Sequence, residues 1–544
     1  MRVGKARAGM RDTRRVSRRA SLWLALLVVV LCSVALSACG SGPASGQPGV
    51  LTFALSEDPD PLDPTTSSTF VSRIVYVDMC EKLYDVGPKL QIVPQLASAL
   101  PQLSKDKKTM TIPLKRNVRF NDGTPFNAQA VKTTLDHFIT YKESSRTGDL
   151  ASVASVEVAD PYTVKLHLKA PSAPLLSLIA DRAGMVLSPT QLKKLGGAKF
   201  ATNPVCVGAF KYTDRVAGDH ITLDKSPFYY DRDKVHLKRI IFKIITDGPV
   251  RASNLRSGDV DVAERLEPFD VVSIKGDSSI HLQTTTSLGY QGITINSGNT
   301  DGTGKPFHPG KVKTPLGQHP ELREAFDAAL DRNVINKVVF YNQVTPDCGP
   351  ISPVSPWFDK GLTCAGRNLA KARALVAKSG VKTPIPVKLL LEASSQTERL
   401  GQVIQAMAKE AGFAVKVVPS EFTTALDRGD QGDFDAFQVG WSGRIDPDGN
   451  LFNQQQSEGS LNYGGEANPA VDKALAEGRT TSDPAKRRQI YQRLIATLNR
   501  DRNIIYLYHD KLFTGSRSDV SGVEVRPDGL PRLAFAGVGG KGGV

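Results

Sequence analysis

The sequence predicts a mixed α/β protein with at least two lobes, because strands and helices follow one another differently in its first and later parts. Residues 153–158 and 163–168 alternate apolar and polar side chains around a turn, which is typical of an antiparallel hairpin. Later, apolar runs at 387–391 and 413–418 flank an amphipathic segment at 398–411. That order predicts a βαβ unit with parallel strands. The length of 544 residues allows three or four units of roughly 100 to 200 residues each.

Other segments complete the expected order of elements. We expect a strand at 109–114, helices at 128–138, from Pro320 or Glu321 to Leu330 and from Asp483-Pro484 to about Leu498, and a last strand at 504–508. The helix after Asp483 has an aspartate that can cap its N-terminus, and a proline in its first turn, where the missing N–H leaves no hydrogen bond unmade.

The first 38 residues have the three parts of a bacterial export signal. Eight basic residues and one acid are followed by an uncharged apolar run at 22–36, and the segment leads into Leu-Ser-Ala-Cys at 36–39. That ending resembles a lipobox, in which the cysteine is lipidated and becomes the first residue after cleavage. We therefore expect a signal peptide at 1–38, a lipid anchor at Cys39 and a flexible Gly/Ser/Pro-rich tether at 39–49. The folded part would lie at the outer face of the bacterial cell membrane.

This signal also changes how the net charge is interpreted. The chain carries +14, but half of that excess lies in the signal, and no run of five or six like charges remains elsewhere to form a nucleic-acid-binding arm. Residues 17–22 partly resemble a twin-arginine signal, so the export route stays open between that pathway and the general one. An uncleaved N-terminal anchor is the alternative to lipidation.

Four cysteines remain in the mature chain: Cys80, Cys206, Cys348 and Cys364. An even number in an oxidising compartment indicates disulfides. Cys348 and Cys364 bracket a Pro- and Gly-rich loop, so we expect them to be bridged, with a gain of roughly 3 kcal/mol in stability. Cys80 and Cys206 are then the remaining pair, either bridged or present as two buried thiols. No Cys-x-x-Cys or closely spaced His pair accompanies them, so we expect no metal site.

The sequence contains no recognisable catalytic constellation. Its eight histidines are isolated, and neither a His-Glu-x-x-His helix nor a Gly-x-Ser-x-Gly elbow is present. Residues 379–382 match Ser-x-x-Lys but lack the Ser-Asp-Asn and Lys-Thr-Gly partners of a serine acyl-transfer site. The acids Asp446 and Asp448 could hold calcium or act in acid-base chemistry, but Asp-Pro-Asp-Gly is more typical of a turn with solvated carboxylates. We therefore expect no enzymatic activity and no cofactor.

A series of short motifs runs in one order along the mature chain. The motifs are LDP at 62–64, CEKLYD at 80–85, VPQLA at 93–97, LKRNVRF at 114–120, DGTPF at 122–126, NPVCVGAFK at 203–211, LRSGDVD at 255–261, LREAF at 322–326, GDFDA at 432–436 and VGWSG at 439–443. Together they closely resemble the family 5 extracellular solute-binding proteins, the dipeptide, oligopeptide and nickel receptors of ABC importers. Each motif is weak alone, but their common order makes the resemblance specific.

The resemblance implies an α/β fold that is two-lobed and periplasmic-binding-protein-like (type II, cluster C), with an extra small α+β domain inserted in lobe 1. The ligand would bind in the cleft as the lobes close around it. Lobe 1 would comprise residues 50–85, 203–285 and 501–544, the last with the tail; the inserted domain would comprise 86–202, and lobe 2 would comprise 286–500.

The resemblance also implies where the ligand binds. The expected ligand-binding residues are Ser67, Ser68, Thr69 and Phe70 from lobe 1, and Val439, Gly440, Trp441, Ser442, Arg444 and Asp446 from lobe 2. In the family, the cleft strand pairs with an extended peptide by strand addition. Trp441 could stack on a ligand side chain or be buried in the core.

Arg444 departs from the family pattern. The dipeptide and oligopeptide receptors have an Asp near this position that pairs with the ligand's amino group, whereas an arginine suits a carboxylate or phosphate. The sequence leaves three interpretations of Arg444 open. The ligand is anionic or N-blocked, Asp446 or Asp448 makes the contact with the ligand's amino group instead, or Arg444 forms a structural pair with a nearby Asp on the loop.

We therefore expect a lipid-anchored, monomeric, non-enzymatic receptor that delivers a peptide or peptide-like solute to the permease and ATPase subunits of an ABC importer. A chaperone or sensor lipoprotein that binds peptide with the same fold is the alternative, and a surface hydrolase is a weaker one. Uptake of a nickel chelate belongs to the first class, but no histidine cluster indicates it.

Overall fold

The computed structural model describes residues 48–539, and every element below lies in that range. The expected signal peptide at 1–38, the lipidation site Cys39 and all but the last residues of the tether at 39–49 lie outside it. Among the described helices, none combines the length and the apolar character that crossing a membrane requires.

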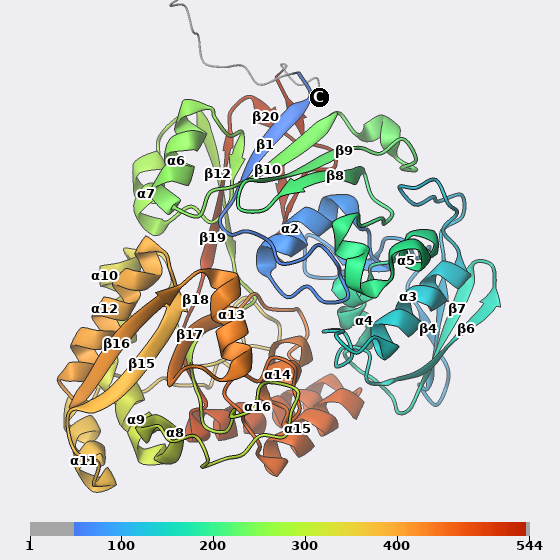
Figure 1. Ribbon diagram of the computed structural model, residues 1–544. Helices are drawn as coiled ribbons and strands as arrows, with labels where there is room; N and C mark the ends of the chain where they lie inside the picture. Colours follow the sequence, from blue (N-terminus) through green and yellow to red (C-terminus); the bar gives the residue numbers. More distant parts are fainter. Residues whose placement is uncertain (1–47, 540–544) are drawn as a thin grey trace, which may run out of the picture. The chain divides into compact units, whose positions relative to one another are not determined.

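The first lobe is built on a seven-stranded sheet (Figure 1). Its strand order is β12 (Ile280–Thr286), β19 (Lys511–Arg517), β11 (Val262–Ala263), β1 (Val50–Leu55), β10 (Arg239–Ile244), β9 (His220–Lys225) and β8 (Phe210–Val216). Strand β1 pairs in parallel with both β10 and β11. Its sequence is almost wholly apolar, as expected for a strand covered on both faces, and Phe53 and Leu55 are fully buried.

Helices and short strands complete this lobe. The helices are α2 (Phe70–Met79), α6 (Gly248–Ser257), α7 (Pro268–Ile274) and the 3-10 helix η3 (Arg232–Lys234). The short strands near the C-terminus are β20 (Val520–Ser521), β21 (Glu524–Val525), β22 (Pro531–Arg532) and β23 (Gly537–Val538).

The expected α+β insertion contains a four-stranded antiparallel sheet. Its order is β4 (Gln102–Leu103), β5 (Thr109–Pro113), β7 (Thr163–Leu168) and β6 (Val153–Asp160), which confirms the predicted hairpin. The predicted helix is α3 (Ala128–Thr140), capped by the Asn127 side chain. Smaller elements are β2 (Tyr84–Val86), β3 (Ile92–Pro94), α4 (Leu175–Leu178), α5 (Pro189–Leu195), η1 (Arg182–Gly184) and η2 (Gly197–Thr202). Buried side chains of the insertion and of the first lobe form one continuous cluster, so the two share a core.

The second lobe is built on a six-stranded sheet, whose strands β15, β16 and β17 are coloured orange in Figure 1. Its order is β14 (Thr345–Pro346), β18 (Ile504–His509), β13 (Tyr290–Ile295), β17 (Ala436–Trp441), β15 (Ile385–Glu392) and β16 (Phe413–Ser420). Strands β15 and β16 are parallel and joined by α12 (Ser395–Lys409), so the predicted βαβ unit is confirmed. The other helices are α8 (Pro315–Gln318), α9 (Pro320–Ala329), α10 (Arg332–Phe340), α11 (Leu369–Ser379), α13 (Phe422–Gln431), α14 (Asp448–Gln455), α15 (Pro469–Thr480) and α16 (Pro484–Asp501).

The chain crosses between the two sheets twice. Strand β12 leads into β13 through residues 287–289, and β18 leads into β19 through Asp510. The two crossings are joined, because the Ser287 N–H donates to the Asp510 carbonyl at 2.8 Å. Strand β18 lies in the second lobe's sheet, so the boundary expected between residues 500 and 501 is too early. The apolar run of β18 predicts a strand, but it carries no information on which sheet that strand joins.

Two disulfides close loops of very different length. Cys80, at the end of α2, is bonded to Cys206, 126 residues away, where the chain returns from the insertion. Cys348 is bonded to Cys364 across the Pro- and Gly-rich loop, 16 residues away.

Candidate ligand-binding cleft

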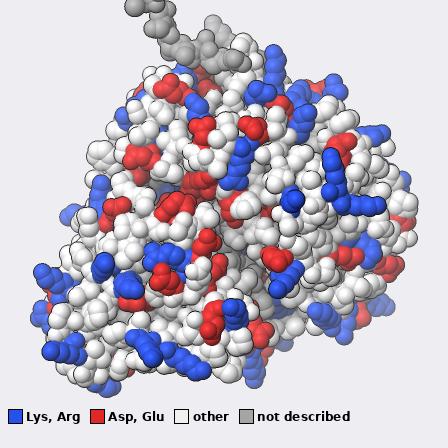
Figure 2. Space-filling view, viewed as in Figure 1, with Lys and Arg blue, Asp and Glu red and all other residues white. Residues whose placement is uncertain are grey.

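A cavity of about 220 Å³ lies where residues of both sheets meet the crossing segments. Figure 2 shows a hollow on this face of the molecule, with Asp and Glu side chains gathered along it. The expected residues that line the cavity are Ser68, Thr69, Phe70, Val439, Gly440, Trp441 and Ser442. The other three expected ligand-binding residues, Ser67, Arg444 and Asp446, lie outside the lining.

The first-lobe segment that faces the cavity is held in place by Asp60. Its carboxylate accepts hydrogen bonds from the hydroxyls of Ser67 (2.9 Å) and Thr69 (2.8 Å) and from the N–H of Ser68. Thr69 is the N-cap of α2, and its hydroxyl accepts from the Ser72 N–H. The segment therefore presents Phe70 to the cavity from a rigid helix start, while Ser67 is turned inward and buried.

Strand β17 has a free side that borders the cavity. It pairs with β13 along its whole length, but with β15 only at Ala436 and Phe437. From residue 438 to 441 the backbone groups that point away from β13 therefore have no strand partner in the described chain. Gly440 is required here by the close approach of β13, because an added Cβ would lie 2.4 Å from the Tyr290 carbonyl oxygen.

Trp441 joins the cavity wall to the core. Its indole N–H donates to the Gly449 carbonyl at 2.9 Å, and one part of the ring packs against a buried cluster that contains Tyr290 and Tyr506. The same residue also lines the cavity. The two roles considered for this side chain, a core residue and a ligand platform, are thus compatible.

Arg444 is held by protein groups. Its guanidinium forms an ion pair with Asp181 of the insertion, lies 4.5 Å from the centre of the Trp441 ring, and donates to the Ser442 hydroxyl at 3.1 Å. Asp181 lies in the inserted domain of the first lobe. It is therefore not the nearby Asp on the loop that the sequence suggests as a partner for Arg444. Because Arg444 pairs with Asp181 and lies outside the cavity lining, the expectation of an anionic ligand loses its basis in this residue.

The acids of the Asp-Pro-Asp-Gly turn are buried, so the prediction of solvated carboxylates is wrong. Asp446 accepts two hydrogen bonds from Arg487 of α16 (2.5 and 2.6 Å), and Asp448 accepts two from Arg479 of α15 (2.8 and 2.9 Å). Paired arginines make this burial possible. Neither acid is available to a ligand's amino group.

A group of charged residues in the cavity is not apparent from the sequence. Glu57 follows β1, Arg265 follows β11, Glu392 ends β15, and Asp510 lies in a crossing. Glu57 and Arg265 form an ion pair. Burial, together with the neighbouring carboxylates of Glu392 and Glu264, raises the pKa of Glu57 to about 8 against the lowering effect of Arg265. These residues come from distant parts of the chain, so sequence patterns do not bring them together. The one local signal that could have indicated a site residue is the position of Glu57 shortly before the LDP motif.

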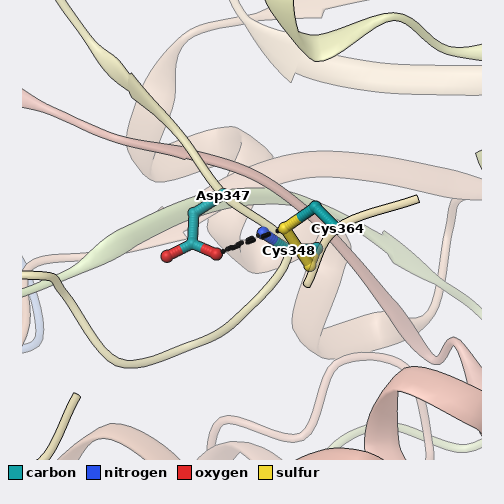
Figure 3. Close-up of side chains that lie close together, drawn as sticks. All are labelled: Asp347, Cys348 and Cys364. Atoms are coloured by element: carbon teal, nitrogen blue, oxygen red, sulfur yellow. Dashed lines mark hydrogen bonds between the residues drawn. A yellow bond between two sulfur atoms is a disulfide. The ribbon is translucent and has the colours of Figure 1, made fainter. Parts of the chain in front are cut away.

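One other cluster has the composition of a metal site but not its chemistry (Figure 3). Within residues 48–539, Asp347, Cys348 and Cys364 are the one set of three His, Cys, Asp or Glu residues whose ligand atoms all lie within 4.8 Å of one another. The two sulfurs are bonded to each other, so they are not the thiolates that a metal needs. Asp347 instead accepts from the Cys348 N–H at 2.6 Å and lies 3.1 Å from His509 Nε2.

Comparison with known proteins indicates the family of this chain. The family described as bacterial extracellular solute-binding proteins, family 5 Middle, matches residues 91–462. The glutathione-binding protein GsiB of Escherichia coli is 25% identical over 496 residues, covering 86% of this chain and 90% of that protein.

Solved structures share the two-lobed fold. The oligopeptide-binding protein AppA of Bacillus subtilis, in complex with a nonapeptide, has a TM-score of 0.81 at 21% identity, covering 91% of this chain and 100% of that one. A dipeptide-binding protein of Pseudoalteromonas, in complex with Met-Leu, has a TM-score of 0.82 at 19% identity, covering 90% and 100%. With the family match over most of the chain and a cavity between two lobes, the chain belongs to the bacterial extracellular solute-binding proteins of family 5.

Proposed function

We propose that the protein is the solute-binding receptor of an ABC importer, which captures a peptide or peptide-like solute between its lobes and delivers it to the membrane permease. It performs no catalysis and acts as a monomer at the outer face of the cell membrane, anchored through lipidated Cys39. GsiB binds glutathione and AppA binds a nonapeptide, so relatives of this chain take peptides of different length.

The observation that carries the proposal is the free side of β17 along the cavity wall. At residues 438–441, the backbone N–H and C=O groups that point away from β13 have no strand partner among residues 48–539, and they can pair with an extended peptide as an added strand. Phe70 from the first lobe and Trp441 from the second lobe both line the cavity and supply apolar surface. A peptide bound to the β17 edge and touching Phe70 would contact both lobes, and contacts that exist only in the closed state favour closure.

Binding of tripeptides with and without backbone methylation tests the proposal. We would titrate Ala-Leu-Ala and its analogue with a methylated central nitrogen into the mature protein and measure affinity by calorimetry. Losing a strand hydrogen bond costs about 1 kcal/mol, and the methyl group also obstructs the edge, so we expect roughly tenfold weaker binding. Replacing Trp357 with Phe leaves Trp441 as the one tryptophan in residues 48–539, and its fluorescence provides an independent signal.

Equal affinity for the two tripeptides would reject strand addition. If a wider panel of peptides, N-acetylated peptides, opine-like acids and metal chelates leaves the folded protein unchanged, a chaperone or sensor role with a larger partner would replace the receptor proposal.

A further inference from the structure

Carboxylates outnumber basic groups where the cavity meets the crossing segments. The acids are Glu57, Glu267, Glu392 and Asp510 in the lining and Glu264 directly behind it. The basic groups are Arg251, Arg265 and Lys511. Buried charges of one sign require partners, so an uncompensated excess of carboxylates is a place where a cation is stabilised.

These basic groups pair with only some of the carboxylate oxygens. Arg251 donates to three backbone carbonyls, those of Ile245 (2.7 Å), Thr246 (2.9 Å) and Arg265 (2.8 Å). Arg265 pairs with Glu57 and lies 3.9 Å from Glu264. Lys511 lies at the wall, with no ion pair among the described residues.

Glu57 provides an independent sign that a ligand group belongs here. Its side chain is 3% exposed, and its Oε2 has no hydrogen-bond partner. Among residues 48–539 no hydrogen bond or ion pair reaches the Glu392 carboxylate either, and burial raises its pKa. A buried carboxylate oxygen without a donor is costly, and a donor on the solute would remove that cost.

The spacing of these acids selects the kind of cation. The set around Asp347 is the one metal-like set of three in the described chain, so no three of the cavity's acids bring carboxylate oxygens within 4.8 Å of one another. An organic cation with several N–H donors can reach separated carboxylates, and a planar guanidinium does so with paired hydrogen bonds.

We propose that Glu57, Glu392 and Asp510 form a subsite for a cationic group of the solute, a guanidinium or an ammonium, and that this group draws the lobes together. Glu57 belongs to the first lobe, Glu392 to the second, and Asp510 to the crossing between them. Burial and the nearby Glu392 carboxylate raise the pKa of Glu57, and a cation bound between the two side chains would stabilise the ionised form of Glu57. The inference rests on the proposed function only in that a peptide-like solute carries the cation.

Matched peptides test the subsite. We would compare Ala-Arg-Ala with Ala-citrulline-Ala, which replaces the guanidinium with a neutral group of similar shape, and Ala-Leu-Ala with its N-acetyl form, which removes the ammonium. We expect one of these pairs to show at least a tenfold difference in affinity for the mature protein. Glu392→Gln should reduce that difference below threefold, and Asp510→Asn serves as a second variant if Glu392→Gln folds poorly. Glu143→Gln, at an exposed position of the insertion outside the lining, should leave the difference unchanged.

The results also separate this inference from the peptide proposal. If no peptide binds but agmatine, at constant ionic strength, raises the melting temperature of the wild type and not of Glu392→Gln, the cation subsite stands and the peptide proposal fails. If peptides bind without any preference for a cationic group, the subsite is rejected. If neither peptides nor agmatine bind, both are rejected.

Discussion

Arg444 on the loop after β17 pairs with Asp181 of the inserted domain, and this buried ion pair joins the two lobes. Asp181 also accepts from Arg73 Nε at 3.1 Å, so its carboxylate has a partner from each lobe. Burial by itself raises the pKa of Asp181, but the charges of Arg444 and Arg73 hold this pKa well below its usual range. We therefore expect the pair to act as a latch between the lobes, at the position where the family pattern implies a ligand contact.

Removing Arg444 should loosen this latch. Truncating one partner of a buried pair costs about 3 to 5 kcal/mol when the other charge is left alone. Arg73 still neutralises Asp181, so we expect Arg444→Ala to lower the free energy of unfolding by about 2 kcal/mol and to increase the radius of gyration. Urea unfolding of Arg444→Ala, Asp181→Ala and the double variant should give a coupling energy of at least about 1 kcal/mol.

A matched surface pair provides the control for the latch. Arg428 and Asp433 pair within the second lobe at 2.9 Å, where Asp433 is exposed and Arg428 is only partly buried. Exposed pairs contribute roughly 0 to 1 kcal/mol, so Arg428→Ala should change stability little. Additive effects of the Arg444 and Asp181 substitutions would show that the two side chains do not act as a latch.

Asp78 should make the protein less stable as the pH rises. Burial raises the pKa of Asp78 to about 7, and hydrogen bonding from the backbone and the charge of Arg532 lower it only in part. The folded protein thus holds this proton more tightly than the unfolded chain, and stability is lost between a pH near 4 and about 7. The pKa of Asp78 differs by about three units between the folded and the unfolded chain. This difference corresponds to a loss of at most about 4 kcal/mol in the free energy of unfolding.

The Asp78→Asn variant tests that prediction. The amide oxygen can still accept from the Leu533 N–H, as Oδ1 does at 2.9 Å, so the native contact is kept. We expect its unfolding free energy to fall less steeply than that of the wild type between pH 5 and 8, as measured by urea titration at several pH values. Identical slopes would mean that Asp78 does not carry this dependence.

The two disulfides should contribute unequally to stability. In the chain-entropy model, a bridge over 126 residues contributes roughly 4 to 5 kcal/mol and one over 16 residues roughly 3 kcal/mol. Replacing Cys80 and Cys206 with Ala should therefore lower the unfolding free energy more than the same change at Cys348 and Cys364. Denaturant unfolding without reductant measures both, and the reverse order would contradict the loop-length argument.

Replacing Cys39 should release the protein from the membrane. Acyl chains contribute about 0.8 kcal/mol per buried CH₂ group, and a serine cannot carry them by a thioether. We expect Cys39→Ser, expressed with its own signal in a bacterial host, to move from the membrane to the soluble extracytoplasmic fraction and to lose palmitate labelling. A variant that stays with the membrane would instead support an uncleaved N-terminal anchor.

Much of the cavity wall follows from sequence motifs. Residues 439–442 of the VGWSG motif and the segment just after LDP both reach the cavity, since each motif is tied to a local backbone feature: a strand that needs a glycine, and a capped helix start. The acidic subsite could not be foreseen. Glu57, Glu392 and Asp510 are more than a hundred residues apart in the sequence and line one cavity only when both sheets have formed.

By itself, the sequence determined the types and order of several helices and strands and the family, because apolar periodicity, capping residues and motif order are local properties. The helix α16 begins at Pro484 after its Asp483 cap, as the pattern predicts. Only the tertiary structure decided that residues 504–509 join the second lobe's sheet and that Arg444 and Asp446 are paired with Asp181 and Arg487. The physical reason is that a charged side chain takes the partner that folding brings within a few ångströms, and that distance is set by the packing of whole lobes.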